Sequence, residues 1–324
     1  MKVYVADRNL VPHRVRFEAA VPAGVELFWA DADGSVECLR DASVHVGGRF
    51  TAEMAAVAEK LELVHVAGAG TDRVAFDALA PDVLVANTFH HERSIAEYVV
   101  AAAIMLRRGF LAQDAALRRD VWASAVYDDT IAQPPTLAGA RIGFVGFGHI
   151  GRQSWKLLRQ WGCGGAAVTG SGRVTGDHGL DRVDDVSRLD ELAGASDVLV
   201  VSAPLTPATT GMIGRTQLDA LGPHGILINV GRGPLVDQRA VYDALRTGRL
   251  GAAAIDVWYR YPEATGRGAL GAPADLPFHE LPNLLMTPHS SGITTDTFRG
   301  RVDDIAANIG RLVRGEPLHN VVTR

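Results

Sequence analysis

The feature that most constrains the fold of this chain is a set of three glycines, Gly146, Gly148 and Gly151, spaced as G-x-G-x-x-G. An apolar run at 142–145 precedes them, and an amphipathic helix is predicted over 149–161. In a turn between strand and helix, the first glycine permits the tight bend, the second lets a pyrophosphate approach, and the third lets the helix pack closely. The pattern therefore predicts a dinucleotide-binding turn. With 35 glycines in the chain a chance match is the competing interpretation, but the flanking strand and helix argue against it.

Length and composition indicate the general class of protein. A chain of 324 residues predicts two domains, and 47% hydrophobic with 21% charged residues is ordinary for a soluble globular protein. The net charge of -5 argues against binding to nucleic acid. The longest apolar stretch, 99–106, is far shorter than the roughly 20 residues that span a bilayer, and residues 1–17 lack the apolar core of a signal peptide. Cys38 and Cys163 have no CxxC spacing, so we expect reduced thiols, no metal site and a cytoplasmic location.

Short β-rich runs alternate with helical or turn-rich segments at the start of the chain, which is the rhythm of βαβ units and a parallel sheet. The predicted strands are 2–6, 25–29, 44–46, 63–66 and 83–86, with a helix over 51–60. Ligands of open α/β sheets bind beyond the carboxyl ends of the strands. Gly68, Ala69 and Gly70 after the fourth strand, and 87–91 after the fifth, are therefore candidates for substrate contact. Gly68 and Gly70 could equally be simple turn glycines.

A long helix is predicted from Ser94 to about Arg119, because Ser94 and Glu97 have the spacing of a capping box ahead of an apolar run. The segment 120–138 that follows is long and irregular, so we expect an exposed arm. The end of the chain predicts one more helix, 294–314, which we expect to pack back on the first domain.

Further apolar runs after the glycine turn complete a doubly wound parallel sheet. They are predicted at 166–169, 197–203, 226–230, 253–257 and 284–286, with a helix over 237–247. Polar residues follow each run at its carboxyl end. Arg232, Asp256 and His289 thus lie at the sheet edge where a nicotinamide ring is expected.

The residues after the second strand of a Rossmann domain decide between the two nicotinamide cofactors, because an acidic side chain there accepts hydrogen bonds from the ribose 2′-hydroxyl. This chain reads Gly170-Ser171-Gly172-Arg173 and has no carboxylate before Asp177. Ser171 and Arg173 could contact a 2′-phosphate, so NADP is favoured over NAD. The competing interpretation is that Arg173 is merely solvated.

Five motifs, in their order and spacing, resemble those of the D-isomer-specific 2-hydroxyacid dehydrogenases. They are Gly146-Phe-Gly-His-Ile-Gly151, Pro204-Leu-Thr-Pro-Ala-Thr209, Asn229-Val-Gly-Arg232-Gly233, Asp256-Val-Trp258 and Pro288-His289-Ser-Ser-Gly292. The resemblance implies an α/β protein of two doubly wound parallel-sheet domains. Residues 1–94 with 293–324 would form a flavodoxin-like substrate-binding lid, and residues 95–292 a Rossmann domain that binds NAD or NADP. It also implies a homodimer.

The same resemblance implies roles for individual residues. Arg232 matches the arginine that binds the substrate carboxylate and polarises its 2-oxo group, and His289 matches the acid/base; both chemistries suit these residue types. The competing interpretation is that Arg232 only anchors a loop and that His289 is a structural histidine. Asp256 matches a contact to the nicotinamide end of the cofactor, with a helix cap or a surface role as its alternative. The residues implied to bind the cofactor are Gly146, Gly148, His149, Ile150, Gly151, Ser171, Arg173, Pro204, Thr209, Val230 and Asp256.

One position departs from the family pattern. The third catalytic residue of the family is a glutamate five positions after Asp256, and this chain has Tyr261 there. Formate dehydrogenases of the same superfamily also lack the glutamate and have glutamine. Glu263 and Glu280 are nearby in the sequence, but either could simply be solvated. The Gly- and Pro-rich stretch 265–282 is expected to be a mobile loop at the rim of the site.

These features predict an oxidoreductase that transfers a hydride between NAD(P)(H) and a small 2-oxo or 2-hydroxy acid. Glyoxylate, hydroxypyruvate and a phosphono-acid analogue all suit an arginine-lined anion site. The alternative is a nicotinamide-sensing regulatory protein without turnover, since some relatives act as transcriptional corepressors. Arg232 and His289 favour the enzyme, and the missing glutamate favours the alternative.

Overall fold

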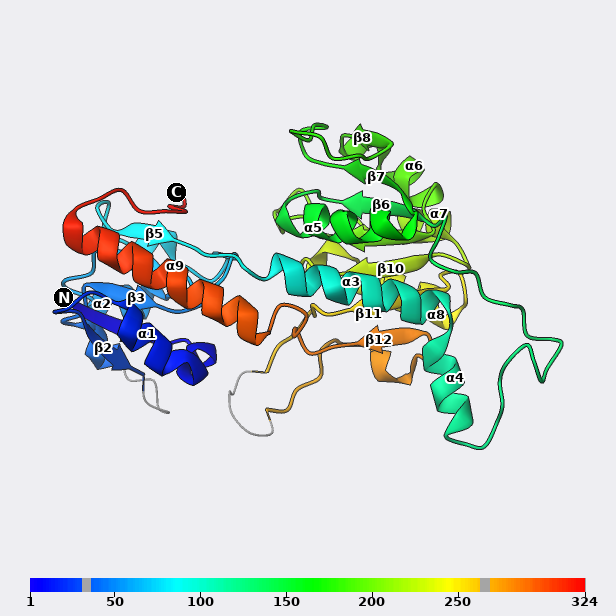
Figure 1. Cartoon of the computed structure of the whole chain (residues 1–324), viewed down its shortest axis with the longest axis horizontal. Coiled ribbons are helices and arrows are strands. Elements are labelled where there is room, and N and C mark those ends of the chain that lie inside the picture. Colours follow the sequence, from blue (N-terminus) through cyan, green and yellow to red (C-terminus); the bar gives the residue numbers. More distant parts are fainter. Residues whose placement is uncertain (31–35, 263–268, 324) are drawn as a thin grey trace. The chain divides into compact units, whose positions relative to one another are not determined.

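The computed structural model describes residues 1–30, 36–262 and 269–323 (Figure 1). Within these ranges the chain forms two compact units, Met1–His90 with Ile293–Arg324 and His91–Gly292. The first division falls after His90 rather than after residue 94, because helix α3 (Glu92–Arg107) begins earlier than predicted and belongs to the second unit. None of the described helices combines the length and the apolar character that crossing a bilayer requires.

The described part of the first unit contains a five-stranded parallel sheet. Its strands are β1 (Lys2–Val5), β2 (Glu26–Trp29), β3 (Val44–Val46), β4 (Leu63–His65) and β5 (Leu84–Ala86). All five were predicted. They are arranged as β2-β1-β3-β4-β5, which is the flavodoxin-like order.

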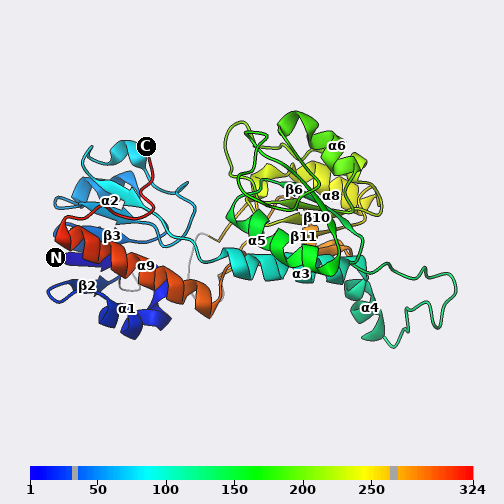
Figure 2. The same ribbon diagram turned by 45° about the horizontal axis from the view of Figure 1, so that its top comes forward.

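Helices cover both faces of this sheet. Helices α1 (Arg14–Ala20) and α9 (Thr295–Arg314) share one hydrophobic cluster with β1 and β3, and α9 lies along the sheet in both views (Figures 1 and 2). Helix α2 (Ala52–Val57) packs in a second cluster, which contains Phe50 and Val64. The predicted C-terminal helix is confirmed, since Thr294 caps its start with its side chain and Gly315 ends it with a φ of +67°.

The described part of the second unit contains a seven-stranded parallel sheet, ordered β12-β11-β10-β9-β6-β7-β8. The strands are β6 (Arg141–Val145), β7 (Gly164–Val168), β8 (Arg182–Asp184), β9 (Val198–Val201), β10 (Ile226–Asn229), β11 (Ala252–Ile255) and β12 (Leu284–Met286). Only β8 was not predicted, because its three residues are polar or half-buried. Strands β7 and β8 continue the sheet on one side of β6, and strands β9 to β12 continue it on the other. This is the Rossmann arrangement, with its switch point between β6 and β9.

The second sheet is also covered on both faces. Helices α3 and α5 (His149–Leu158) pack on one face, where Val99 of α3 and Trp155 of α5 are buried. Helices α6 (Leu189–Gly194), α7 (Arg215–Leu221) and α8 (Gln238–Arg246) pack on the other. Short 3-10 helices complete the description: η1 (Arg8–His13), η2 (Val36–Leu39), η3 (Phe76–Ala78), η4 (Arg159–Trp161), η5 (Val186–Arg188), η6 (Gly233–Leu235) and η7 (Phe278–Glu280).

The predicted helix from Ser94 to Arg119 is wrong in two respects. Ser94 lies inside α3, where its hydroxyl donates to the carbonyl of His91, so it is not the N-cap. The helix also breaks at Gly109, whose φ of +66° separates α3 from α4 (Phe110–Leu117). The arm after α4 is confirmed as irregular and exposed, and it extends away from the rest of its unit (Figures 1 and 2).

The strands of the second sheet are paired in register, so residues in one row mark the same height on each strand. One such row consists of Val168, Val145, Val201, Asn229, Ile255 and Met286, on β7, β6, β9, β10, β11 and β12. Parallel strands end on the same side of the sheet, so the segments that follow this row all emerge at one edge. Each candidate residue of the second unit follows the residue of that row on its own strand by no more than eight positions in the sequence.

Two histidines are buried in the first sheet. His45 on β3 is fully buried beside Phe50, and neither ring nitrogen has a hydrogen-bond partner among the described residues. His65 on β4 is also fully buried, and its Nε2 lies 3.0 Å from the side-chain nitrogen of Asn308. Burial lowers the pKa of His45 to about 3 and that of His65 to about 4, the latter against a hydrogen bond with Val66 and the charge of Asp304. Both rings are therefore neutral in the folded chain near neutral pH.

We predict that the free energy of unfolding falls as the pH drops from about 6.5 toward 4, because unfolding then lets both histidines take up a proton. Each contributes a slope of about 1.4 kcal/mol per pH unit in that window. His45→Leu should remove about half of this slope, measured by urea unfolding between pH 4 and pH 7. The exposed His224→Gln is the control and should leave the slope unchanged. Equal slopes in wild type and His45→Leu would contradict the prediction.

Candidate active site

Gly146 and Gly151 occupy positions at the turn between β6 and α5 that leave no room for a side chain. Gly146 has a φ of +84°, and a Cβ built on it would lie 2.7 Å from the backbone nitrogen of Ala203 on the neighbouring segment. A Cβ on Gly151 would lie 2.9 Å from the carbonyl oxygen of Gly146. The first and third glycines are therefore required by close backbone packing.

Gly148 differs from these two, because a Cβ built on it would meet nothing within 4 Å. It is the N-cap of α5 and offers no side-chain cap to the first helical turn, in which His149 is exposed and Ile150 is half-buried. The start of a helix carries a partial positive charge and N–H groups that bind anions. Open space in front of such a helix start fits the pyrophosphate of a dinucleotide.

The end of β7 forms a tight turn. The hydroxyl of Thr169 accepts a hydrogen bond of 3.2 Å from the N–H of Arg173, and the hydroxyl of Ser171 donates to the carbonyl of Arg173 at 3.3 Å. Both Ser171 and Arg173 are exposed. A Cβ on Gly172 would lie 3.2 Å from the Cβ of Asp185, which follows β8. Sequence reasoning missed this neighbouring acid because it missed β8.

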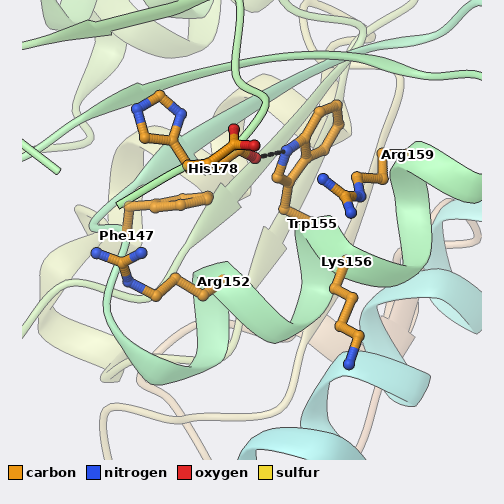
Figure 3. Close-up of a pocket in the computed structure, with 7 residues that line it drawn as sticks. Phe147, Arg152, Trp155, Lys156, Arg159 and His178 are labelled. Atoms are coloured by element: carbon orange, nitrogen blue, oxygen red, sulfur yellow. Dashed lines mark hydrogen bonds between the residues drawn. The ribbon is translucent and has the colours of Figure 1, made fainter. Parts of the chain in front are cut away.

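A cavity of about 190 Å³ lies beside α5 (Figure 3). It is lined by Phe147, Arg152, Trp155, Lys156, Arg159, Asp177 and His178. Figure 3 shows Arg152 near Phe147 at one end and Arg159 near Trp155 at the other. Arg152 donates to the carbonyl of Thr175 at 3.1 Å, and the indole of Trp155 donates to the carbonyl of His178 at 2.7 Å. These hydrogen bonds join the segment between β7 and β8 to α5. None of the predicted site residues lines the cavity.

The segment after β9 forms a loop that is held by hydrogen bonds between its own residues. The hydroxyl of Thr209 donates to the carbonyl of Pro204 at 2.8 Å and accepts from the N–H of Thr206 at 2.8 Å. Pro204 is exposed at the carboxyl edge of the sheet, directly after the switch point. Val230 after β10 is different, because its side chain is buried in the core and leaves only its backbone for a ligand.

Arg232 lies in a turn that is shaped by its neighbours. The buried amide of Asn229 accepts a hydrogen bond from the N–H of Gly231 at 3.2 Å and donates to the carbonyl of Arg232 at 3.0 Å. A Cβ on Gly233 would lie 2.3 Å from the carbonyl oxygen of Trp258, so the turn packs directly on the segment after β11. The guanidinium of Arg232 is half-buried and donates to the carbonyl of Gly231 at 2.9 Å.

Asp256 holds the loop that carries His289. Its carboxylate is buried and accepts hydrogen bonds from the hydroxyl of Thr287 at 2.7 Å, from the N–H groups of Ser290 at 2.9 Å and Ser291 at 3.2 Å, and from the hydroxyl of Ser291. The predicted helix-cap alternative is wrong, because these donors belong to a loop. Contact of Asp256 with a cofactor stays a prediction.

His289 is exposed and has a φ of +56°, a left-handed conformation that costs a non-glycine residue about 1–3 kcal/mol. The ring of Tyr261 lies beside it, with the ring centroids 5.5 Å apart. The hydroxyl of Tyr261 accepts a hydrogen bond from the N–H of Trp258 at 3.1 Å. Glu280 is exposed in η7, whereas Glu263 and residues 265–268 of the predicted mobile loop lie outside the described residues.

Register brings the ends of the two strands that precede the predicted catalytic residues to the same height. Asn229, Ile255 and Met286 are paired across β10, β11 and β12, and Arg232 and His289 each follow this row by three positions. Adjacent strands are about 4.8 Å apart, so β10 and β12 are separated by about 10 Å.

The predicted substrate loop belongs to the first unit, whereas Arg232 and His289 belong to the second. Gly68, Ala69 and Gly70 follow β4 and are half-buried. The carbonyl of Gly68 accepts from the N–H of Thr88 at 3.2 Å, and the carbonyl of Ala69 accepts from the side chain of Asn87 at 2.9 Å. The loops after β4 and β5 are thus joined at the carboxyl edge of the first sheet.

Sequence reasoning missed the residues that position the site. Asn229 could have been noticed as an amide three residues before a glycine-flanked arginine. Ser290 and Ser291 stand next to His289 in the motif, but nothing in the sequence shows that they bind Asp256.

The family described as "D-isomer specific 2-hydroxyacid dehydrogenase, NAD binding domain" matches residues 100–291. A D-3-phosphoglycerate dehydrogenase from Methanocaldococcus jannaschii is 30% identical over 294 residues, which are 89% of this chain and 53% of that protein. This chain therefore spans about half the length of that relative.

A hydroxyphenylpyruvate reductase from Plectranthus scutellarioides is 30% identical over 82% of this chain and 80% of its own length. Among solved structures, an NADPH-dependent glyoxylate/hydroxypyruvate reductase from Sinorhizobium meliloti matches with a TM-score of 0.81 and 24% identity, over 99% of this chain and 98% of that one. This likeness shows the fold. Together with the family match over 100–291, these comparisons show that the chain belongs to the D-isomer specific 2-hydroxyacid dehydrogenase family.

Proposed function

We propose that this protein is an NAD(P)-dependent oxidoreductase that interconverts a small 2-oxo acid and the corresponding 2-hydroxy acid. The observation that supports the proposal is that Arg232 and His289 follow, each by three residues, the paired row at the carboxyl ends of β10 and β12. An arginine and a histidine at the carboxyl edge of a Rossmann sheet lie where a nicotinamide ring is expected. Family membership supports the same reaction class.

The glycine turn would hold the cofactor. Gly148 and the first turn of α5 would bind the pyrophosphate, and the segments that begin at Ser171 and Pro204 would flank the two halves of the molecule. A bound nicotinamide dinucleotide supplies the hydride for reduction and accepts it for oxidation.

Arg232 would bind and orient the acid. Its planar guanidinium can pair with a carboxylate through two parallel hydrogen bonds, which fixes the 2-oxo group in one orientation. Negative charge develops on the oxo oxygen during reduction, and the same cation stabilises that charge. Asn229 and the close packing of Gly233 on Trp258 keep the turn rigid.

His289 would move the proton. In reduction its imidazolium donates a proton to the oxo oxygen as the carbon gains the hydride, and in oxidation the neutral ring takes the proton back. The left-handed backbone of His289 stores strain that the hydrogen bonds to Asp256 offset. Asp256 thereby acts as a positioning residue for His289.

The first unit would contribute the substrate loop Gly68, Ala69 and Gly70, and would act as the substrate-binding lid. The relatives named above reduce or oxidise acids of this kind according to their names. Glyoxylate, hydroxypyruvate and a phosphono-acid analogue are the candidate substrates.

NADP stays the favoured cofactor, because Ser171 and Arg173 are both exposed at the end of β7. Asp185 weakens this preference by placing a carboxylate beside Gly172. That carboxylate accepts two hydrogen bonds from Ser187, which lower its pKa and occupy one of its oxygens.

We also propose a homodimer in the cytoplasm. Cys38 and Cys163 are free thiols, as a reducing compartment requires. The arm after α4 exposes Trp122 and Tyr127 by 62% and 67%, and exposed aromatic side chains are typical of protein interfaces. Light scattering measures the mass directly.

The first test is a screen of small 2-oxo acids with NADPH and NADH, followed by the fall in nicotinamide absorbance. We expect turnover with at least one acid and a lower dissociation constant for NADPH by calorimetry. Arg173→Ala should weaken NADPH binding, by removing a cation from the 2′-phosphate, and leave NADH unaffected. Arg215→Ala on α7 is the control. Tighter binding of NADH to the wild type would overturn the cofactor preference alone.

Arg232→Ala should lower kcat/KM by on the order of 100-fold or more, because the carboxylate loses both its binding partner and its orientation. His289→Ala should lower it by roughly 100-fold to 10,000-fold through loss of the proton donor. Both variants should still bind the cofactor, as measured by calorimetry. Wild-type rates in either variant would remove the catalytic assignment and favour the regulatory alternative.

Tyr261→Glu should move the pH limbs of reduction and oxidation upward, by no more than roughly one to three units, because a nearby carboxylate favours the imidazolium form of His289. The measurement is kcat/KM against pH in both directions. Tyr261→Phe keeps the ring beside His289 without adding charge, so it should leave the limbs in place. Unmoved limbs in Tyr261→Glu would show that another acid already fills this role.

A further inference from the structure

Trp258 contacts both of the turns that carry the proposed catalytic residues. It follows β11, which lies between β10 and β12 in the sheet. Its side chain is 5% exposed and packs edge-on against Phe278, with the ring centroids 5.9 Å apart. Trp258 and the residues that it contacts all belong to the second unit. Burial holds the indole in one orientation, and the N–H of a buried indole requires an acceptor.

The indole N–H binds the turn that presents His289. Its Nε1 donates a hydrogen bond of 2.8 Å to the carbonyl of Thr287, and the same carbonyl accepts from the N–H of His289 at 3.0 Å. The second bond closes a three-residue turn around Pro288. A carbonyl oxygen has two lone pairs, so it accepts from both donors. Trp258 thus binds the oxygen on which the turn before His289 closes.

Thr287 is bound through three polar groups to β11 and the segment that follows it. Its N–H donates to the carbonyl of Ile255 at 3.1 Å, and its hydroxyl donates to the carboxylate of Asp256 at 2.7 Å. The hydrogen bond from Trp258 to the carbonyl is the third. Asp256 and Trp258 therefore hold different groups of the same residue, and a change in the Trp258 side chain leaves the bond to Asp256 in place.

The backbone of Trp258 packs against the turn that presents Arg232. A Cβ built on Gly233, the residue after Arg232, would lie 2.5 Å from the carbonyl carbon of Trp258 and 3.0 Å from the backbone nitrogen of Tyr259. This contact involves only main-chain atoms of Trp258, so it survives a change of the side chain. The side chain and the backbone of one residue therefore contact the two turns separately.

We propose that Trp258 is a positioning residue for the reaction, which acts on His289 through the hydrogen bond from its indole N–H to the carbonyl of Thr287. This inference rests on the proposed function and adds a residue to it. His289 has a strained left-handed backbone, so the position of its ring depends on the turn before it. Loss of the indole bond lets that turn relax and displaces the imidazole from the substrate. A displacement of about 1 Å can cost on the order of 100-fold in rate.

Trp258→Phe should lower kcat by on the order of tenfold or more and leave KM for the 2-oxo acid within about twofold. The phenyl ring lacks the N–H, whereas the backbone contact with Gly233 keeps the turn of Arg232 in place. A bond that serves only proton transfer acts in the transition state alone, so kcat and kcat/KM should fall together. The solvent deuterium isotope effect on kcat should rise, because proton transfer becomes the slow step. Steady-state kinetics in water and in deuterium oxide measure these quantities.

Trp155→Phe on α5 is the matched control. The indole of Trp155 also donates to a backbone carbonyl, that of His178 at 2.7 Å, and its side chain is 4% exposed. Both substitutions remove the same ring atoms and the same kind of bond, so both should lower the midpoint of thermal unfolding. Only Trp258→Phe should lower kcat. Naphthylalanine at position 258 keeps a bicyclic ring without the N–H, so it should lower kcat while it preserves the packing and the folded state.

A double-mutant cycle tests whether Trp258 acts through the histidine. In the His289→Ala background, Trp258→Phe should change kcat by no more than about twofold, because the group that Trp258 positions is already absent.

A fall in kcat that is confined to position 258 and disappears without His289 supports the inference. The inference is overturned, and the proposed function stands, if both variants at position 258 keep the wild-type kcat, if Trp155→Phe loses as much activity, or if Trp258→Phe lowers kcat equally without His289. If wild type turns over no 2-oxo acid, or if His289→Ala keeps the wild-type rate, the proposed function fails and this inference fails with it.

Discussion

In-register pairing of parallel strands is the constraint on which the candidate site of this protein depends. The row that joins Val145, Val201, Asn229, Ile255 and Met286 fixes the height at which each strand of the second sheet ends. Because every strand is parallel, five separate loops emerge at one edge, and Arg232, Asp256 and His289 each lie in one of these loops. A slip of one residue in any pair would also turn that strand's buried side chains to the opposite face, so the cores on both sides keep the register.

Close backbone contacts then determine how these loops are shaped. Gly146, Gly151 and Gly233 each occupy positions where an added Cβ would lie within 2.9 Å of backbone atoms, so the segments can only touch if these residues are glycine. Gly148 and Gly68 do not have this requirement, since an added Cβ would meet open space or ordinary contacts. The same residue type therefore serves packing at some positions and leaves room for a ligand at others.

A buried carboxylate stabilises the least favourable part of the site. His289 has a left-handed backbone, and the loop around it donates several hydrogen bonds to Asp256, which is 1% exposed. A buried charge of this kind is costly unless its oxygens are satisfied, and satisfying them requires the loop to fold around it. Strain at His289 and desolvation of Asp256 are thus offset by one set of bonds.

The sequence by itself determined the two α/β units, all of the strands except β8 and the glycine turn, and it made Arg232 and His289 candidates for the site, because hydrophobic periodicity and motif spacing are local properties of the chain. It misplaced the start of α3 and the break at Gly109, where the left-handed glycine overrides a continuous helical pattern. Only the tertiary structure decided what the side chains touch. Asp256 bonds to residues more than 30 positions away, Asp185 lies beside Gly172 through a strand that the sequence did not reveal, and Arg301 reaches Gly68 from a helix at the other end of the chain. Such contacts follow from strand order and helix packing, which depend on the whole chain at once and leave no local pattern in the sequence.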